Sequence, residues 1–376
     1  MRFAHPAALS GPPIDWAAVD RVLVVRPDNL GDVVLAGPAI RALRAALPTA
    51  RIDLLASPAG AQVAPLLPGL DEVIEARVSW QQIDPRQVRP DDDTDLVQRL
   101  SERRYHAAII LTSFSQSPWV PAYLCQRAGI PVRVGTSKEF GGPALTHWVP
   151  APPDETHQVD RALYVLYRVG VPPVGAELEL RVPAAALRAA AGVRHAAGIP
   201  DAVGYAVVLP GASCAARRYP ASRYTEVTRL LTESGRVVLV VGTDREHDLV
   251  REVARDVPGA VPVAGATGVP ELAALIADAD VVVCNNSGGA HLADALRVPV
   301  VVLFSGTEQV SQYGPRTGEA EVLTVPTWCA PCRRFTCPYT MACLDLDPSA
   351  VAQAALRLAR RPVGVGRGGA PAASVS

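Results

Sequence analysis

The stretch VVRPDNLGDVVLAG, from Val24 to Gly37, reads as a strand, a turn and the start of a helix. In nucleotide-binding α/β proteins, this first turn usually holds a phosphate on free backbone N–H groups. Here Asp32 stands at the mouth of the helix, where a carboxylate would repel a phosphate. Either Asp32 caps the helix that runs on to Leu47, or it has a chemical task other than phosphate binding.

A second polar stretch, VVLPGASCAARRYPASRY from Val207 to Tyr224, follows an apolar strand. Its small residues let the loop bring backbone N–H groups, Ser213, Arg217 and Arg218 to one anion. Two guanidinium groups that can each form bidentate pairs suit a diphosphate. The alternative is a solvated loop with surface arginines. Ser222 is expected to be the N-cap of the next helix.

A third stretch, residues 281–308, contains the phosphate-type turn that the first one lacks: VVVCNNSGGAHLADALRVPVVVLFSGTE. Asn286 and Ser287 follow the strand, and Gly288 opens a helix that carries His291. Glycine permits close backbone approach, and a helix N-terminus supplies N–H donors and a positive dipole end. The alternative is an ordinary polar turn with His291 in a structural role.

Two further groups of carboxylates have a chemical and a structural interpretation. Glu246, in VVGTDREHD, could hold a ribose, or it could complement the dipole of its helix from the first turn. Asp91, Asp92 and Asp93 formally make a D-x-D, the pair that holds a divalent cation in metal-dependent sugar transferases. No strand-like run precedes them, so we expect a solvated loop there.

Four of the seven cysteines are clustered in CAPCRRFTCPYTMAC, with the spacing C-x₂-C-x₄-C-x₅-C. The four thiolates, Cys329, Cys332, Cys337 and Cys343, could close a tetrahedral structural zinc site. Two labile disulfides, or thiols that merely pack together, are the alternatives. A structural role is expected in each case, because a catalytic zinc keeps an open coordination position.

Short β-branched runs alternate with longer runs rich in Ala, Leu and Arg, which is typical of parallel sheets joined by helices. Strands are expected at 22–25, 51–56, 73–75, 107–111, 132–135, 205–209, 237–241, 260–263, 281–284 and 300–304. Helices are expected at 32–47, 59–67, 95–104, 119–128, 157–169, 184–198, 222–234, 245–254, 270–279 and 289–296. The polar residues 77–95 are expected to form a loop. We therefore predict an α/β protein with two doubly wound, Rossmann-like domains facing a central cleft.

Composition argues against several classes of function. The formal net charge of −1 gives no global field for nucleic acid or for a membrane surface. No apolar run reaches 18 residues, and the first residues do not resemble a signal peptide, so we expect a cytoplasmic protein. Lys138 is the one lysine among 36 basic residues, a compositional bias for which we expect arginine at some positions where related chains carry lysine.

In this order and spacing, the stretches resemble family 9 of the glycosyltransferases, the bacterial heptosyltransferases that add heptose from ADP-heptose to the lipopolysaccharide core. The resemblance runs from Arg21 to Leu356 and rests on RPDNLGDVVLAGPAIRALRAALP, LPGASCAARRYP and NNSGGAHLADALRVPVVVLF. The cysteine-rich stretch resembles the heptosyltransferase II branch. The family implies a GT-B fold, inversion at the anomeric carbon and no cofactor required for catalysis.

The resemblance also implies a division of labour between the two domains. It places the acceptor on the Rossmann-like domain 21–170 and the nucleotide sugar on the Rossmann-like domain 184–346. Around them we expect an N-terminal extension at 1–20, a linker at 171–183, a C-terminal helix at 347–361 and a disordered tail at 362–376. The G-x-G-x-x-G of that tail follows no strand and is not expected to bind a dinucleotide.

The resemblance gives each candidate residue a role. Asp32 would take the proton from the acceptor hydroxyl as its oxygen attacks the sugar. Asn29 and Gly31, in the same turn, are expected on the acceptor side. The donor-binding residues would be Ser213, Arg217, Arg218, Glu246, Asn286, Ser287, Gly288 and His291. Their cationic and N–H groups would stabilise the leaving ADP.

Two positions depart from the family pattern. Arg217 stands where the family usually has lysine, which keeps the charge but not the geometry. Asn286 stands where the family usually has an aspartate that contacts the donor sugar, so the donor sugar is left open. The acceptor is expected to be a glycan or a small natural product, with peripheral membrane contact if it is a lipid.

Two other functions fit the same sequence. One is a sugar-nucleotide epimerase or hydrolase, which would act on the donor without an acceptor. The other is a non-catalytic protein that binds a nucleotide sugar, an interpretation prompted by Asn286. Asp32 argues against the second, because a protein that only binds needs no base there.

Overall fold

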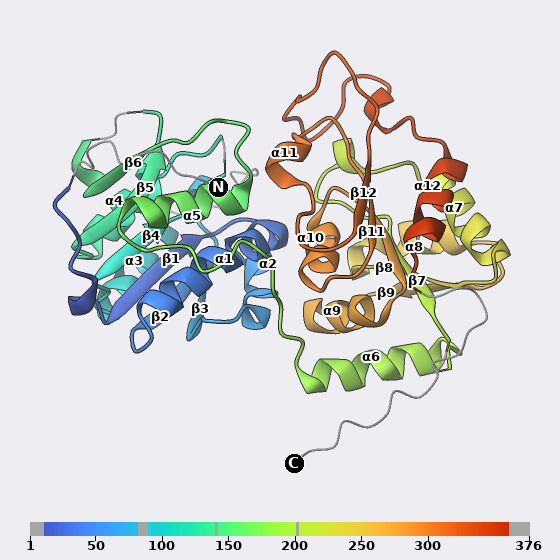
Figure 1. Ribbon diagram of the computed structural model, residues 1–376, viewed down its shortest axis with the longest axis horizontal. Coiled ribbons are helices and arrows are strands. Elements are labelled where there is room, and N and C mark those ends of the chain that lie inside the picture. Colours follow the sequence, from blue (N-terminus) through green and yellow to red (C-terminus); the bar gives the residue numbers. More distant parts are fainter. Residues whose placement is uncertain are drawn as a thin grey trace. The chain divides into compact units, whose positions relative to one another are not determined.

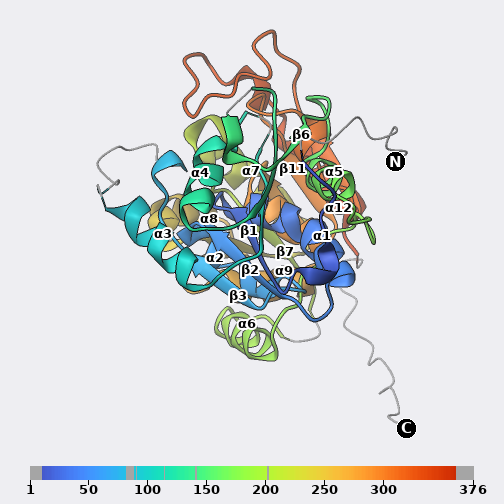
Figure 2. The same ribbon diagram turned by 90° about the vertical axis from the view of Figure 1, so that its left-hand side faces the viewer.

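The computed structural model describes residues 11–81, 89, 91–113, 115–139, 142–200 and 203–360. The chain divides into two compact units, Met1–Arg181 (unit 1) and Val182–Ser376 (unit 2). Within the described residues, each unit holds a parallel six-stranded sheet with helices on both faces (Figure 1, Figure 2). The predicted α/β class with two doubly wound sheets is confirmed.

In unit 1 the strands lie in the order β3-β2-β1-β4-β5-β6, and all neighbouring pairs are parallel. The central strands are almost completely buried, because helices cover both faces, and they are accordingly continuous apolar runs. The strands are β1 (Arg21–Arg26), β2 (Arg51–Ala56), β3 (Glu72–Glu75), β4 (Ala107–Ile110), β5 (Val132–Ser137) and β6 (His147–Pro150).

The helices of unit 1 form two layers. On one face α1 packs against α5, and on the other α3 packs against α4 over a core of strand, α3 and α4 side chains (Figure 1). The helices are α1 (Leu30–Ala46), α2 (Pro58–Ala61), α3 (Asp92–Glu102), α4 (Trp119–Arg127) and α5 (Gln158–Arg168). The described residues after α5 pack on the same unit, since Arg181 N donates to Leu66 O at 2.8 Å.

Unit 2 repeats this plan with strand order β12-β11-β10-β7-β8-β9. Its strands are β7 (Tyr205–Leu209), β8 (Val237–Gly242), β9 (Ala260–Ala264), β10 (Val281–Asn285), β11 (Val300–Leu303) and β12 (Ala320–Leu323). Helices α7, α8 and α12 cover one face, and α6, α9 and α10 pack together. The helices are α6 (Ala184–Ala196), α7 (Ala221–Glu233), α8 (His247–Ala254), α9 (Val269–Asp278), α10 (Gly288–Ala295), α11 (Val310–Tyr313) and α12 (Pro348–Leu358).

Several local predictions were wrong. The helix expected at 59–67 is α2 followed by a separate 3-10 turn, Ala64–Leu66, because Pro65 has no N–H to donate and its ring obstructs a continuous α-helix. The loop expected at 77–95 ends earlier, since α3 begins at Asp92 and places three carboxylates in its first turn, where they complement the helix dipole. Asp92 and Asp93 of the D-x-D are thus helical.

Ser222 is not an N-cap, because α7 begins at Ala221 with Pro220 at the cap position. Strands β6 and β12 were not predicted, and both are four-residue strands at the edge of a sheet. Such short edge strands are partly exposed and carry little apolar pattern. The tail predicted to be disordered, 362–376, lies outside the described residues. No helix in the part of the chain that the structure describes is long and apolar enough to cross a membrane.

Each sheet has one point where the order of its strands reverses. The reversal lies between β1 and β4 in unit 1 and between β7 and β10 in unit 2. Open α/β sheets bind ligands beyond the carboxyl ends of their strands at such a switch point. The residues that follow these four strands are therefore the expected binding and catalytic residues of each unit.

Candidate active site

Arg26 links the two sides of the unit 1 switch point. It is the last residue of β1 and is only 3% exposed. Its Nε lies 3.2 Å from Asp28 Oδ2, and its Nη2 lies 3.0 Å from Asp32 Oδ1. The same Nη2 donates to Ser113 Oγ, beyond β4, at 2.8 Å. One buried guanidinium thus holds two carboxylates and the loop after the neighbouring strand.

Asp32 does not cap its helix. It is the third residue of α1, whose N-cap is Asn29, and Asn29 makes no side-chain cap hydrogen bond. Asp32 Oδ1 instead accepts from Arg26 and, at 3.3 Å, from Ser113 Oγ. Oδ2 makes no hydrogen bond or ion pair with the described residues, and the side chain is 18% exposed. The cap interpretation was therefore wrong, and the side chain is partly exposed with one oxygen that makes no hydrogen bond to the described residues.

Asp28 is a second carboxylate of this site that was not predicted from the sequence. Its Oδ1 accepts from Gln116 Nε2, beyond β4, at 2.5 Å. Burial raises the pKa of Asp28 above its usual value, and the Asp32 carboxylate acts in the same direction, whereas Arg26 and Gln116 oppose it. The buried Asp28 therefore anchors Arg26, and the more exposed Asp32 is the carboxylate that can meet a substrate.

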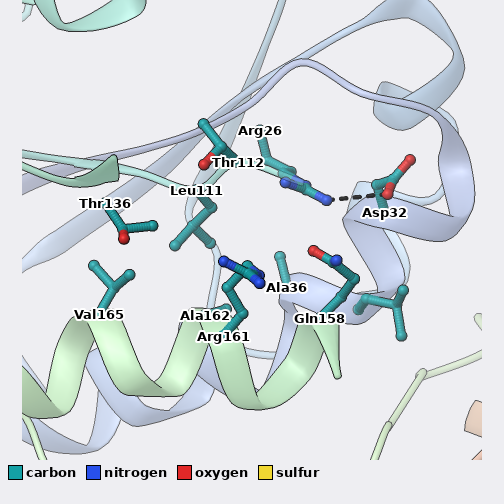
Figure 3. Close-up of a pocket in the computed structure, with 11 residues that line it drawn as sticks. Arg26, Asp32, Ala36, Leu111, Thr112, Thr136, Gln158, Arg161, Ala162 and Val165 are labelled. Atoms are coloured by element: carbon teal, nitrogen blue, oxygen red, sulfur yellow. Dashed lines mark hydrogen bonds and ion pairs between the residues drawn. The ribbon is translucent and has the colours of Figure 1, made fainter. Parts of the chain in front are cut away.

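A small pocket opens beside Asp32 between α1 and α5 (Figure 3). From α5, Gln158 and Arg161 point into it, opposite Arg26 and Asp32. Gln158 is 3% exposed, and its Nε2 donor has no hydrogen-bond partner among the described residues. The pocket is therefore lined by this amide donor, from Gln158, and by the carboxylate of Asp32. This arrangement suits a ligand that carries hydroxyl groups.

The other residues expected on the acceptor side differ in accessibility. Asn29 is exposed at the helix entrance, whereas Gly31 is buried in the first turn of α1. Gly31 can therefore shape the turn but offers little surface to a ligand. Asn29 remains a predicted acceptor contact.

Asn285 organises the unit 2 switch point. It ends β10 and is fully buried. Its Oδ1 accepts from Tyr219 N at 3.0 Å, and its Nδ2 donates to Pro210 O and Gly211 O at 2.9 and 3.1 Å. A side-chain amide is suited to this position because it donates and accepts at once. Asn285 thus fixes the loop that carries the expected donor-binding arginines.

The loop after β7 does not present both arginines alike. Arg218 turns back on its own loop and donates to Ala212 O at 3.1 Å. Arg217 points to the loop after β11, donating from Nε to Thr307 Oγ1 at 3.1 Å and pairing with Glu308 at 2.6 Å. Ser213 is exposed. The two guanidinium groups therefore do not point to one place, which differs from the prediction that both bind the same diphosphate. Arg217 is the better placed of the two to bind it.

The start of α10 has the features of an anion-binding turn. Ser287 is the N-cap and makes no side-chain cap hydrogen bond, and the first turn contains no acidic residue. A Cβ on Gly289 would lie 2.3 Å from Leu209 Cδ1, so a larger residue in this turn would require the Leu209 side chain to move. Asn286 Oδ1 accepts from Ser305 N at 3.1 Å. His291 is 8% exposed on the same helix.

Glu246 belongs to a capping box at the start of the turn after β8. Its Oε2 accepts from the backbone N and the Oγ1 of Thr243, both at 2.9 Å. A Cβ on Gly211 would lie 1.9 Å from Glu246 Oε1. Glu246 thus has a structural role at the start of its helix, as one interpretation predicted. Its carboxylate also lies next to the loop after β7. The ribose contact stays a prediction.

The four clustered cysteines are half-buried free thiols. Burial raises the pKa of Cys343, and the other three thiols add to the rise, so the four lie close enough to interact. Even so, no group of three or more Cys, His, Asp or Glu residues in the described part of the chain is arranged to hold a metal ion. The geometry therefore gives the zinc hypothesis no support, and it remains a prediction.

Sequence reasoning missed several residues of both sites. In unit 1 these are Arg26, Asp28, Ser113, Gln116, Gln158 and Arg161, and in unit 2 Thr307, Glu308 and Arg333. Four of them follow a strand in polar stretches, Ser113 and Gln116 in TSFSQS after β4 and Thr307 and Glu308 in SGTE after β11. That position beyond a strand was the signal that could have found them.

Comparison with known proteins agrees with this architecture. Residues 94–342 match the family model for glycosyltransferase family 9 (heptosyltransferase). Lipopolysaccharide heptosyltransferase 2 of Escherichia coli (strain K12) is 26% identical over 345 residues, covering 88% of this chain and 96% of the relative. Lipopolysaccharide heptosyltransferase 3 of Escherichia coli is 26% identical over 294 residues, covering 74% and 82%.

Solved structures show the same fold. The family 9 glycosyltransferase of Veillonella parvula superimposes with a TM-score of 0.74 at 20% identity, covering 90% of this chain and 97% of that one. The ADP-heptose lipopolysaccharide heptosyltransferase II of E. coli gives 0.71 at 22% identity, covering 90% and 98%. The fold is therefore of the GT-B type, as predicted. The chain belongs to glycosyltransferase family 9, the heptosyltransferase family, and is a glycosyltransferase.

Proposed function

We propose that this glycosyltransferase moves a heptose from ADP-heptose to a hydroxyl group of a lipopolysaccharide-type glycan, with inversion at the anomeric carbon. The names of the relatives support the donor and the acceptor class. The observation that carries the mechanism is the accessible carboxylate of Asp32, which does not cap its helix and lies beside a pocket with an amide donor.

In the proposed reaction Asp32 accepts the proton of the acceptor hydroxyl as the oxygen attacks the anomeric carbon. Arg26 and Ser113 hold one oxygen of Asp32, and the other oxygen takes the proton of the acceptor hydroxyl. The bond from the anomeric carbon to the diphosphate breaks, and its electron pair leaves with ADP. Arg217 and the N-terminus of α10 stabilise the negative charge of that leaving group.

Asn286 fits this proposal although the family usually has aspartate there. Its Oδ1 is used by Ser305 N, so its Nδ2 is the atom that can face the donor. An amide N–H donates where a carboxylate accepts. A donor hydroxyl would therefore act as acceptor at this position, which leaves room for a donor sugar other than the usual heptose.

The test is a transfer assay with ADP-heptose, with and without a lipopolysaccharide inner-core acceptor. We expect ADP to be released, and the acceptor to gain one heptose by mass, only when the acceptor is present. ADP release without acceptor would instead indicate a hydrolase or an epimerase-like activity. If ADP-heptose binds but the inner-core glycan is not modified, the acceptor assignment is wrong, and other glycans and natural products are the next acceptors to try.

A further inference from the structure

The cysteine-rich segment, residues 327–343, is attached to the loops of the unit 2 site. Cys332 N donates to Gly306 O at 2.9 Å, and Arg333 N donates to Thr307 O at 3.1 Å. On its other side, Ala216 N donates to Phe335 O at 3.0 Å. The segment thus joins the loop after β11 to the loop after β7, which carries Arg217.

This attachment turns Arg333 toward the site. Its backbone has a φ of 56°, in the left-handed region that few residues other than glycine adopt. Its side chain pairs with Glu308 Oε2 and donates to Gln312 Oε1 at 2.9 Å. Glu308 Oε1 lies 2.6 Å from Arg217 Nη2. One carboxylate therefore holds two guanidinium groups that come from segments far apart in the sequence.

The charges of this cluster favour an anion. Two guanidinium groups and one carboxylate leave a net charge of +1, and the side chains of Arg217, Arg333 and Glu308 are 22%, 28% and 15% exposed. The contacts of Arg217 use its Nε and Nη2 and leave Nη1 for a ligand. Partial burial strengthens the attraction to a bound anion relative to water.

The sheet order places this cluster beside the anion-binding turn. Strands β11, β10 and β7 are neighbours, so the loops that carry Glu308 and Arg217 flank the turn from β10 into α10. Carboxyl ends of neighbouring parallel strands lie at one edge of a sheet. A diphosphate at the start of α10 would therefore lie within the reach of two flanking guanidinium groups.

We propose that Arg333 binds the diphosphate of the donor together with Arg217, and that Glu308 is the positioning residue that holds the two side by side. This inference rests on the proposed function, because it takes the donor to be a nucleoside-diphosphate sugar. It also gives the cysteine-rich segment a task, which is to present Arg333. Without Glu308 the two guanidinium groups would repel each other and lose their shared orientation.

Calorimetric titration with ADP and with AMP tests the inference without any turnover. Arg333→Ala should weaken ADP binding about 10- to 100-fold, the range for a hydrogen bond to a charged group. AMP should be affected less, because it lacks the second phosphate. Arg334→Ala is the matched control, since Arg334 is the exposed neighbour on the same segment, and its ADP affinity should stay near that of the wild type.

A positioning role predicts non-additivity. Glu308→Gln should weaken ADP binding in the wild-type background and have little effect on ADP binding in the Arg217→Ala/Arg333→Ala background. In turnover, Arg333→Ala should raise the KM for the donor and leave the KM for the acceptor unchanged. Arg333→Lys, which keeps the charge, should restore part of the ADP affinity and serves if Arg333→Ala does not fold.

The outcomes separate this inference from the proposed function. A folded Arg333→Ala protein with wild-type ADP affinity, beside an Arg217→Ala protein with reduced affinity, would overturn the inference and leave the donor site in place. If Arg217→Ala also binds ADP normally, the donor site itself is misplaced. An equal loss for AMP and ADP would show that Arg333 does not bind the second phosphate.

Discussion

At the unit 1 switch point one guanidinium, Arg26, lies between the carboxylates of Asp28 and Asp32, whereas beside the unit 2 switch point one carboxylate, Glu308, lies between Arg217 and Arg333. The first cluster has a net formal charge of −1 when both carboxylates are ionised, and the second of +1. Asp28 and Asp32 follow β1, whereas Arg217 and Glu308 follow β7 and β11, and the two sheets have the same strand order relative to the switch point. The topology of the sheet therefore determines where each unit can bind a ligand, and the side chains at that place determine which ligand it binds.

The helices that begin at the two sites show the same contrast. The first turn of α1 contains Asp32, so its positive dipole end already faces a carboxylate. The first turn of α10 contains no acidic residue and begins with two glycines. Proton transfer and binding of an anionic leaving group need opposite local charge, and a chain with two similar sheets can supply each from a different sheet.

The largest expected effect concerns Asp32. Asp32→Asn keeps an oxygen that can accept from Arg26 and Ser113, and removes the proton acceptor. We expect kcat to fall roughly 10²- to 10⁴-fold, the usual contribution of a general base, while stability and ADP affinity stay near those of the wild type. Steady-state transfer assays, with Asp92→Asn on the first turn of α3 as the control, measure this. Near-normal turnover would end the proposed mechanism.

Removing the shared guanidinium should be the most destabilising change at the unit 1 site. Arg26→Met leaves two neighbouring carboxylates without their common partner in a buried place. We expect the free energy of unfolding to fall by about 3–5 kcal/mol, the cost of breaking a buried ion pair by removing one partner. Urea denaturation measures it. A loss below about 1 kcal/mol would show that the carboxylates do not depend on Arg26.

In unit 2 the corresponding fixed point is a neutral amide. Asn285→Leu leaves Tyr219 N and two loop carbonyl groups without their partner, so we expect about 2–4 kcal/mol of lost stability. Because the same loop carries Arg217, ADP affinity should fall as well. Ser213→Ala, an exposed change on that loop, is the control and should alter stability by less than about 0.5 kcal/mol. An Asn285→Leu protein of wild-type stability would contradict this assignment.

Asp28 should give stability an unusual dependence on pH. Burial raises its pKa in the folded protein, so the folded state binds this proton more tightly than the unfolded state does. The resulting cost is absent below the unfolded pKa and grows as pH rises from that value to the folded pKa. Relative to Asp28→Asn, the wild type should therefore lose up to about 1.4 kcal/mol per pH unit in that window.

Urea midpoints of the wild type and Asp28→Asn between about pH 4 and pH 8 measure this difference. The usual case is the opposite, since an ion-paired aspartate has a lowered pKa and stabilises the fold as pH rises. If the wild type gains stability relative to Asp28→Asn over this range, Arg26 outweighs burial at Asp28.

The features that depend on neighbouring residues could be predicted from the sequence. The contacts that depend on the order of strands in the sheet could not. The alternation of strands and helices, the position of Asp32 beyond β1 and the first-turn placement of Glu246 all follow from local pattern. The contact of Arg26 with Ser113 joins residues 87 positions apart, and that of Arg217 with Glu308 joins residues 91 positions apart. Both depend on which strands are neighbours.

Local pattern also failed where one residue overrode it. The apolar run at 59–67 reads as one helix until Pro65 is taken into account, and Ser222 resembles an N-cap although Pro220 occupies that position. At Asp32 the preference of aspartate for helix N-termini suggested a cap, but a buried guanidinium nearby is a stronger partner than backbone N–H groups. The local sequence pattern does not show which charged group the folded chain brings next to a residue.

The smallest expected effect is that of removing divalent cations. The acidic stretch that could have held one is used within unit 1, since Asp92 Oδ2 accepts from Arg89 N at 2.8 Å and Asp93 Oδ2 accepts from Ser79 Oγ at 2.7 Å. In the mechanism proposed here, guanidinium groups and the N-terminus of α10 take the place of a cation on the diphosphate. Transfer should therefore continue at an unchanged rate in excess EDTA.

Elemental analysis of the same sample would show whether the clustered thiols hold zinc, and circular dichroism would show whether the fold survives chelation. If a folded protein loses activity in EDTA and Mg²⁺ or Mn²⁺ restores it, then unit 2 needs a cation on the diphosphate. The guanidinium groups and the N-terminus of α10 would then not be sufficient.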